Sequence, residues 1–118
     1  MEFPKHEGGC HCQNVRYEVQ IDLTQIINCN CSICHKRGSV LGFVAESQFK
    51  LLKGQDAQTD YQFNKKNIHH LFCKTCGIMS YGTGTGPDGM KMIAINVRCL
   101  DGIDVSELDP VSVDGKLF

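Results

Sequence analysis

The sequence predicts a mainly β fold built from short strands and stabilised in part by bound metal. Several segments alternate between apolar and polar residues, which is the period of a half-buried strand. No segment of the 118 residues keeps a helical period of apolar positions. Seven of the eight cysteines fall in three tight clusters, so we expect thiolate-bound metal to help hold a thin core together.

The first predicted elements lead into the second cysteine cluster. Residues 14–20 alternate cleanly, with valine, tyrosine and valine on one face, and predict a strand. Residues 22–25 are typical of a turn, and a second strand begins at Ile26. Residues 32–38 predict a single helical turn that Gly38 ends.

The middle of the chain predicts four further strands. Residues 40–45 predict a strand, followed by a turn at 46–49 and a short strand at 50–52. The stretches 61–63 and 68–72 predict the two arms of a hairpin, joined by a polar Asn-Lys-Lys-Asn turn. The second arm runs directly into the third cysteine cluster.

The last third of the chain predicts two strands around a glycine-rich loop. Residues 78–81 predict one strand and residues 92–97 the last strong one. The segment 82–89 between them predicts a flexible loop, either a plain hairpin connection or a substrate lid. It lacks the Gly-Lys-Ser/Thr ending of a phosphate-binding loop. The tail after Asp104 is loosely patterned, and we expect residues 1–118 to form a single domain.

The overall charge and the N-terminus exclude several classes of protein. A net charge of -1 gives no support for a nucleic-acid partner. There is no secretory signal and no apolar run of membrane-spanning length, so we expect a cytoplasmic location and no membrane partner. Thiols stay reduced in the cytoplasm, which favours metal ligands over disulfides. A disulfide framework remains the alternative if the chain is secreted.

Two of the cysteine clusters have the spacing of paired metal ligands. Cys73-Lys-Thr-Cys76-Gly77 is typical of a knuckle in which both sulfurs face one ion and glycine completes the turn. No βαβ pattern supports the alternative of a redox pair. Cys10-His-Cys12 can deliver two ligands if the backbone bends, which the two preceding glycines permit. Four thiolates from two such loops would close a tetrahedron, although spacing alone leaves the pairing open.

The remaining cluster gathers Cys29, Cys31 and Cys34 within six residues. Three thiolates could hold zinc and leave one position for another ligand. Since three thiolates on Zn²⁺ leave a net negative charge, bound water would be a weak acid, and a thiol ligand suits such a site better. Two alternatives remain: Cys99 could supply a fourth ligand and make both sites structural, or the cluster could hold iron and sulfur.

Five motifs follow one another along nearly the whole chain: Gly8-Gly-Cys-His-Cys12, Val15-Arg-Tyr-Glu18, Cys29-Asn-Cys-Ser-Ile-Cys34, Phe72-Cys-Lys-Thr-Cys-Gly77 and Ile95-Asn-Val-Arg-Cys-Leu-Asp-Gly102. In this order and spacing they resemble the glutathione-dependent formaldehyde-activating enzymes, whose domain is shared with centromere protein V. The sequence departs from that pattern at Gln13, where many relatives are expected to carry glycine after the cysteine.

The resemblance implies a zinc-binding β-tent domain of short antiparallel sheets that binds two zinc ions. It implies a structural zinc held by Cys10, Cys12, Cys73 and Cys76. It also implies a catalytic zinc held by Cys29, Cys31 and Cys34. The activity that it implies is a carbon–sulfur lyase reaction that joins glutathione and formaldehyde to give S-hydroxymethylglutathione. Two other functions stay open: a non-catalytic, zinc-stabilised binding module, and an enzyme for a different thiol and carbonyl pair.

Five charged or titratable residues are further candidates. Arg98 follows the last strand and could bind a substrate carboxylate, or form a surface ion pair instead. Lys36 and Arg37 could balance the charge of the triple cluster, or belong to a solvated face. His69 and His70 should point to opposite faces of a strand, as proton shuttles or as ordinary core and surface residues.

Overall fold

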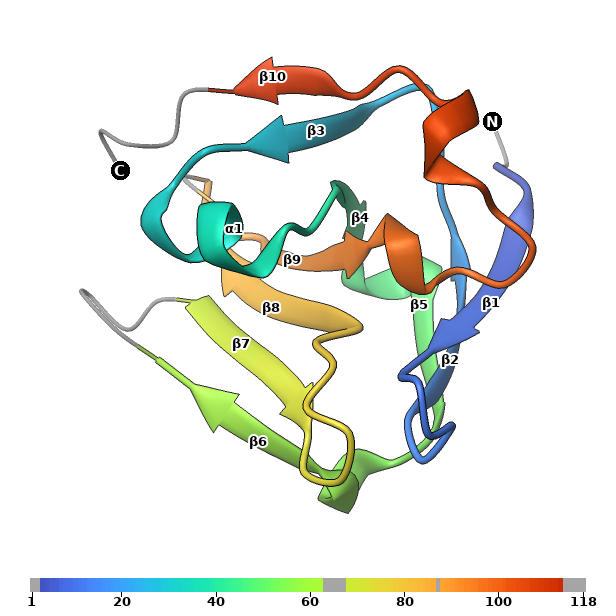
Figure 1. Ribbon diagram of the computed structural model, residues 1–118, viewed down its shortest axis with the longest axis vertical. Coiled ribbons are helices and arrows are strands. Elements are labelled where there is room, and N and C mark those ends of the chain that lie inside the picture. The colour runs from blue at the N-terminus through green and yellow to red at the C-terminus, as the bar shows by residue number, and fades with distance from the viewer. Residues whose placement is uncertain (1–2, 63–67, 87, 114–118) are drawn as a thin grey trace.

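The structure, a computed structural model, describes residues 3–62, 68–86 and 88–113 and confirms the mainly β prediction. A three-stranded sheet has the order β1-β2-β5 and a larger sheet of seven strands has the order β10-β3-β4-β9-β8-β7-β6. Figure 1 shows the small sheet standing along one side of the large one. The strands of the small sheet are β1 (Lys5–Gly9), β2 (Arg16–Gln20) and β5 (Phe49–Lys53). Those of the large sheet are β3 (Ile26–Cys29), β4 (Leu41–Ala45), β6 (Gln58–Tyr61), β7 (Ile68–Cys73), β8 (Tyr81–Thr85), β9 (Lys91–Asn96) and β10 (Val111–Val113).

In the part of the chain that the structure describes, helical structure is confined to short pieces. Helix α1 (Ser32–Arg37) begins shortly after β3, and the left-handed Gly38 (φ 71°) ends the helix as predicted. Within the described ranges, no helix reaches the length and apolar character needed to span a bilayer. The α-helix is α1 (Ser32–Arg37), and the 3₁₀ helices are Glu46–Gln48, Gln55–Ala57, Val97–Cys99 and Val105–Glu107.

The main core lies between the two sheets and is centred on Tyr17. This side chain is fully buried, and its ring lies 5.2 Å from that of Phe49 and 5.7 Å from that of Tyr81. Its hydroxyl donates a hydrogen bond of 3.0 Å to the carbonyl of Ser80, which satisfies the one polar atom that Tyr17 brings into the core. Alternation along β2 therefore identified the buried face correctly.

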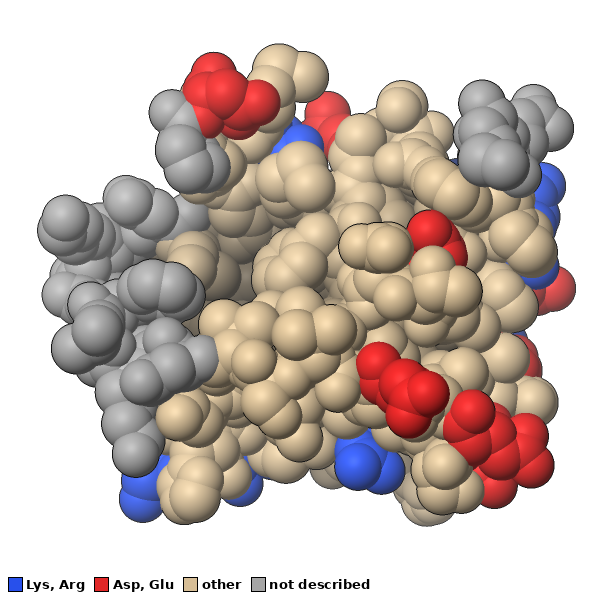
Figure 2. Space-filling view, turned by 90° about the horizontal axis from the view of Figure 1, so that it is seen from above, with Lys and Arg blue, Asp and Glu red and all other residues tan. Residues whose placement is uncertain are grey.

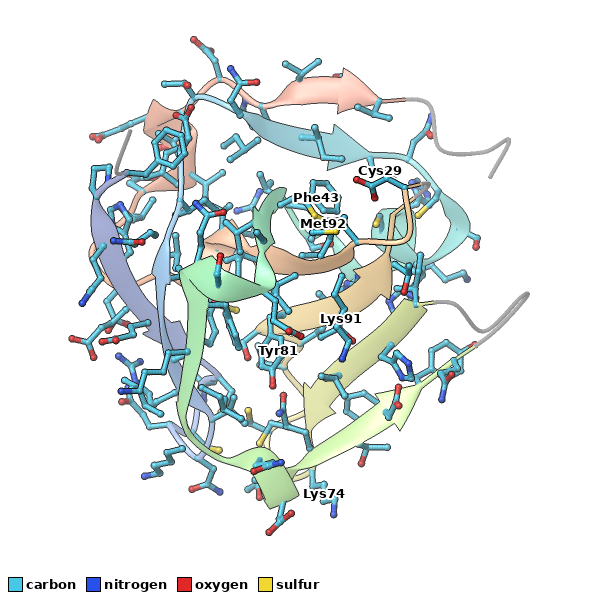
Figure 3. All side chains as sticks on the ribbon, turned by 180° about the vertical axis from the view of Figure 1, so that it is seen from behind. Cys29, Phe43, Lys74, Tyr81, Lys91 and Met92 are labelled. Atoms are coloured by element: carbon cyan, nitrogen blue, oxygen red, sulfur yellow. The ribbon has the colours of Figure 1, made fainter. Side chains whose placement is uncertain are left out.

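The large sheet has a second face, which points away from this core. Val44 of β4 and Ile93 of β9 are paired and face the core, so the residues next to them face the other way. We call the side that carries Leu41 and Phe43 the second face. α1 covers the end of it around Leu41, whereas Phe43 is 48% exposed. Figure 3 shows Phe43 beside Met92 on the part of this face that α1 leaves open.

Two glycine-rich segments form strands that sequence patterning did not predict. A side chain at Gly8 in β1 would come within 2.6 Å of the carbonyl oxygen of Cys99. One at Gly82 in β8 would come within 2.8 Å of the carbonyl oxygen of His69. These glycines permit close backbone approach, so the prediction of a flexible loop at 82–89 is wrong for the residues that belong to β8.

Several other boundaries differ from the prediction. The strand expected at 78–81 begins only at its last residue, because the chain is irregular between the knuckle and β8. The first arm of the predicted hairpin lies earlier, at β6, while position 63 and the turn at 64–67 fall outside the described residues. At the other edge, β10 pairs in parallel with β3, which was not predicted.

The turn between β1 and β2 shows why many relatives are expected to carry glycine where this chain has Gln13. Its φ of 72° makes it the one non-glycine residue in the left-handed region among those described. Its N–H donates to the carbonyl of Cys10 at 3.3 Å, so the turn that carries two cysteines depends on this conformation. Glycine adopts the conformation without steric cost.

Replacing Gln13 by glycine is therefore expected to stabilise the protein. The left-handed conformation costs a side-chain-bearing residue about 1–2 kcal/mol, and the extra freedom of unfolded glycine offsets about half of that gain. We expect the free energy of unfolding in urea to rise by about 0.5–1 kcal/mol. Asn14→Gly is the control, since Asn14 has no positive φ and its replacement should lower stability. Equal behaviour of the two variants would contradict the explanation.

Candidate metal centres

Four thiols from two distant parts of the chain meet at the end of the small sheet. Cys10 and Cys12 lie in the turn after β1, while Cys73 ends β7 and Cys76 lies in the knuckle that follows. Their sulfur atoms all lie within 4.8 Å of one another. The Cys10–Cys12 and Cys12–Cys73 sulfur distances are 3.6 and 3.5 Å. Thiolates about 2.3 Å from a tetrahedral zinc stand about 3.8 Å apart, so this set fits a closed metal site.

Local backbone geometry aims N–H groups at these sulfurs. The N–H of Val15 donates to the sulfur of Cys10 at 3.3 Å. The N–H of Thr75 donates to the sulfur of Cys73, also at 3.3 Å. Gly77, at a φ of 78°, closes the knuckle by donating to the carbonyl of Cys73. The hydrogen bonds from N–H groups to the sulfurs of Cys10 and Cys73 favour the thiolate form, which is the form that binds metal.

The pKa values of these thiols are unequal. Burial raises the pKa of Cys76. The N–H groups of Cys12 and Ile78 and the neighbouring thiols lower it by more, so that the pKa of Cys76 is about 6. The N–H of Asn14 lowers the pKa of Cys12, but burial and the neighbouring thiols raise it to about 11. Four adjacent thiols cannot all ionise at neutral pH without a compensating charge. A bound divalent cation supplies that charge, because a coordinating thiol is deprotonated outright.

The second group of thiols lies on the second face of the large sheet. Cys29 ends β3, Cys31 precedes α1 and Cys34 lies within the helix, and their sulfurs also lie within 4.8 Å of one another. Figure 3 shows Cys29 at the end of its strand, next to the chain that leads into α1. The N–H of Cys31 donates to the sulfur of Cys29 at 3.4 Å. Among the described residues, no fourth ligand side chain joins this group.

Cys99 does not close the triple cluster. Its thiol contacts the carbonyl oxygen of Met79 at 3.7 Å. Burial, and then the nearby thiols Cys10 and Cys76 of the four-thiol group, raise its pKa to about 11. The geometry therefore leaves the triple cluster with three protein thiols and does not support the alternative of two closed sites.

Arg37 links the triple cluster to β7. Its guanidinium donates to the sulfur of Cys34 at 3.8 Å, to Nδ1 of His70 at 3.5 Å and to the hydroxyl of Ser39 at 3.3 Å. Burial, and then the charge of Arg37, lower the pKa of His70, so its ring is neutral at pH 7. As predicted, His69 faces the other way, where it contacts Asp60 at 2.6 Å.

Two hollows flank α1. The larger measures about 510 Å³ and contains two of the three clustered thiols. Its lining is mostly polar: Asn28, Cys29, Asn30, Cys34, His35, Gly38, Ser112 and Val113. The smaller measures about 160 Å³ and is lined by Ile33, Arg37, Tyr61, His70, Phe72, Gly77 and Met79. Seen from the β10 side, much of the described surface is uncharged (Figure 2). Of the two thiol groups, the triple cluster is the one that contributes residues to the larger hollow.

The remaining predicted residues lie around α1. Arg98 is exposed, and its Nε donates to the carbonyl of Gly38 at 3.2 Å, so it lies at the end of the helix beside the larger hollow. Lys36 is exposed. Sequence reasoning did not single out Asn28 and Asn30, although both flank Cys29 in the chain and that position was the signal that could have found them.

Comparisons with known proteins identify a family and a similar fold. Residues 5–113 match the family described as glutathione-dependent formaldehyde-activating enzyme. The fold is similar to the crystal structure of a Rhodobacter sphaeroides protein, with a TM-score of 0.80 and 30% sequence identity. That similarity covers 90% of this chain and 97% of the other. The chain belongs to the glutathione-dependent formaldehyde-activating enzyme family.

Proposed function

We propose that this protein is a zinc-dependent enzyme of the carbon–sulfur lyase type that joins glutathione and formaldehyde to form S-hydroxymethylglutathione. The observation that carries the proposal is the contrast between the two thiol groups. One has four sulfurs in a closed arrangement, while the other has three and opens into a polar hollow. A structural zinc site uses four protein ligands, and a catalytic one keeps a position for substrate.

The donor chemistry of both groups fits zinc. Thiolates are soft ligands, and sets made only of sulfur select zinc over magnesium, calcium or manganese. In this proposal the structural zinc is held by Cys10, Cys12, Cys73 and Cys76, and the catalytic zinc by Cys29, Cys31 and Cys34. When bound at the second set, zinc would supply Lewis acidity and a template for the thiol substrate. All eight cysteines are free thiols, which supports a reducing compartment, and we propose the cytoplasm.

The larger hollow suits a peptide-like thiol. Asn28, Asn30 and Ser112 line it with groups that both donate and accept hydrogen bonds, as the amides of glutathione require. Arg98 lies at the rim, where its planar guanidinium could bind one of the carboxylates of glutathione. Arg37 offsets the negative charge that three thiolates bring to the site.

The reaction conserves electrons and needs no oxidant. The sulfur of glutathione forms a bond to the aldehyde carbon as the carbon–oxygen π bond opens onto oxygen. The proton that leaves the thiol ends on that oxygen. The chain's own contribution is to bind the thiol beside the cluster and to orient it, which reduces the entropy cost of bringing two molecules together.

Serine variants of three cysteines test the assignment of the two metal sites. Cys76→Ser is expected to abolish cooperative thermal unfolding, because structural zinc contributes directly to folding. Cys31→Ser is expected to stay folded and to bind one zinc in place of two, and Cys99→Ser should keep both. Circular dichroism and elemental analysis measure these outcomes. Similar behaviour of Cys31→Ser and Cys76→Ser, or loss of a zinc from Cys99→Ser, would sink the assignment.

The activity itself is tested by measuring exchange between formaldehyde and its glutathione adduct by NMR. The zinc-loaded protein should accelerate this exchange above the uncatalysed rate, and Cys31→Ser should remove the acceleration while Cys99→Ser retains it. No acceleration by a protein that holds only one zinc would favour a binding module. Acceleration with other aldehydes but none with formaldehyde would favour a different carbonyl substrate.

The charge of Arg37 is expected to matter for metal retention at the triple cluster. Replacing a residue that supports a metal ligand typically lowers affinity about 10- to 100-fold. Arg37→Gln should lower the zinc affinity of the triple cluster by that factor, measured by competition with a chelator, and leave the four-thiol site unchanged. The exposed neighbour Lys36 provides the control, Lys36→Gln. Equal affinities in the two variants would show that Arg37 has no such role.

A further inference from the structure

We infer that the smaller hollow beside α1 binds the organic group of a carbonyl substrate larger than formaldehyde, an aromatic or similarly bulky aldehyde. The inference rests on the proposed function, because it names the class of carbonyl compound that would react at the same thiol cluster. It is carried by the position of the hollow, by its volume and by the chemistry of its walls.

The hollow adjoins the triple cluster. Arg37 lines it, and the same guanidinium donates to the sulfur of Cys34. Ile33 and Phe72 also line it, and both pack in the small apolar cluster that contains the three thiols. No clustered cysteine lines the hollow itself, but Arg37 and the apolar cluster place a group bound there beside Cys34, and α1 contributes residues to both hollows.

The volume of the hollow exceeds what formaldehyde requires. An apolar cavity of about 150 Å³ holds a benzene molecule, and the hollow measures about 160 Å³. Formaldehyde has two heavy atoms and would leave most of that space to water. A substrate that fills it carries a group the size of a six-membered ring in addition to its carbonyl.

The walls favour an apolar ring. Ile33, Phe72 and Met79 supply apolar surface, and Met79 is 6% exposed, so its flexible side chain can adapt to a ligand without being displaced into solvent. Tyr61 and His70 also line the hollow, with their ring centroids 6.3 Å apart. An aromatic ring such as that of Tyr61 can pack edge to face against a bound ring.

The polar groups of the hollow suit a carbonyl oxygen. Arg37 has five N–H donors and no acceptor. Three of its N–H groups donate to the partners described above, so within the described structure the others can donate to a ligand. A carbonyl oxygen accepts such hydrogen bonds, and it gains negative charge as the thiol adds to the carbon. A charged organic group would instead lose its hydration against apolar walls.

The first experiment measures binding without turnover. Zinc-loaded protein is titrated with benzyl alcohol, which carries the ring and an oxygen but cannot accept a thiol, and backbone amide shifts are followed by NMR. We expect saturable shifts at Ile33, Phe72 and Met79 and none at Phe43 or Met92, which lie on the uncovered apolar part of the same face. Shifts confined to Phe43 and Met92, or no saturation, would overturn the inference.

The second experiment fills the hollow. Ile33→Trp should lower the affinity for benzyl alcohol at least about tenfold, and should lower the ratio of kcat/KM for benzaldehyde to that for formaldehyde by a similar factor. Leu52→Trp, on the exposed side of the small sheet, is the matched control and should change neither. If Ile33→Trp does not fold, Tyr61→Ala removes one wall and should weaken binding about threefold to tenfold. Unchanged binding in the folded variants contradicts the site.

The two hypotheses fail separately. Formaldehyde turnover with glutathione, combined with no binding of benzyl alcohol in the hollow, overturns this inference and leaves the proposed function standing. Binding in the hollow, combined with no acceleration of any aldehyde by glutathione, supports the binding site and contradicts the proposed function.

Discussion

The convergence of four thiols at the end of the small sheet is the constraint on which the rest of the structure depends. Cys10 and Cys12 come from the turn after β1, and Cys73 and Cys76 come from the end of β7, so the group joins the small sheet to the large one. Neighbouring thiolates repel one another unless a cation lies between them. A metal ion bound at this point would therefore set how the two sheets meet and would allow a thin core to be stable.

The core that forms beneath this junction is small and is centred on the buried Tyr17. Tyr17 fills the space between the sheets with its ring and directs its hydroxyl to the carbonyl of Ser80, which also accepts from the N–H of Asn96. The small sheet packs against one face of the large sheet. The second face is therefore left for α1 and the triple cluster. The main core and the triple cluster therefore lie on opposite sides of the large sheet.

Helix α1 has an organising role despite its length of six residues. It holds Cys34, carries Arg37 on its last turn and contributes residues to both a polar hollow and an apolar one. In the two proposals, the polar hollow would receive the peptide thiol and the apolar one the organic group of the carbonyl compound. Arg37 contacts a cluster sulfur and lines the apolar hollow, so in these proposals a single guanidinium would influence both the charge of the metal site and the recognition of the carbonyl group.

The sequence alone determined the mainly β class, the buried face of β2, the helical turn that ends at Gly38 and the three cysteine clusters, because alternation, glycine and cysteine spacing are local signals. It could not determine β1 or β8, whose glycines form strands through close backbone contacts with segments distant in the chain. Nor could it determine where Cys99 lies or that Arg37 meets His70, since both depend on which strands become neighbours. Tertiary structure decided these points. Strand pairing brings together side chains that are far apart in the sequence, and such contacts produce no periodic pattern in the amino-acid sequence.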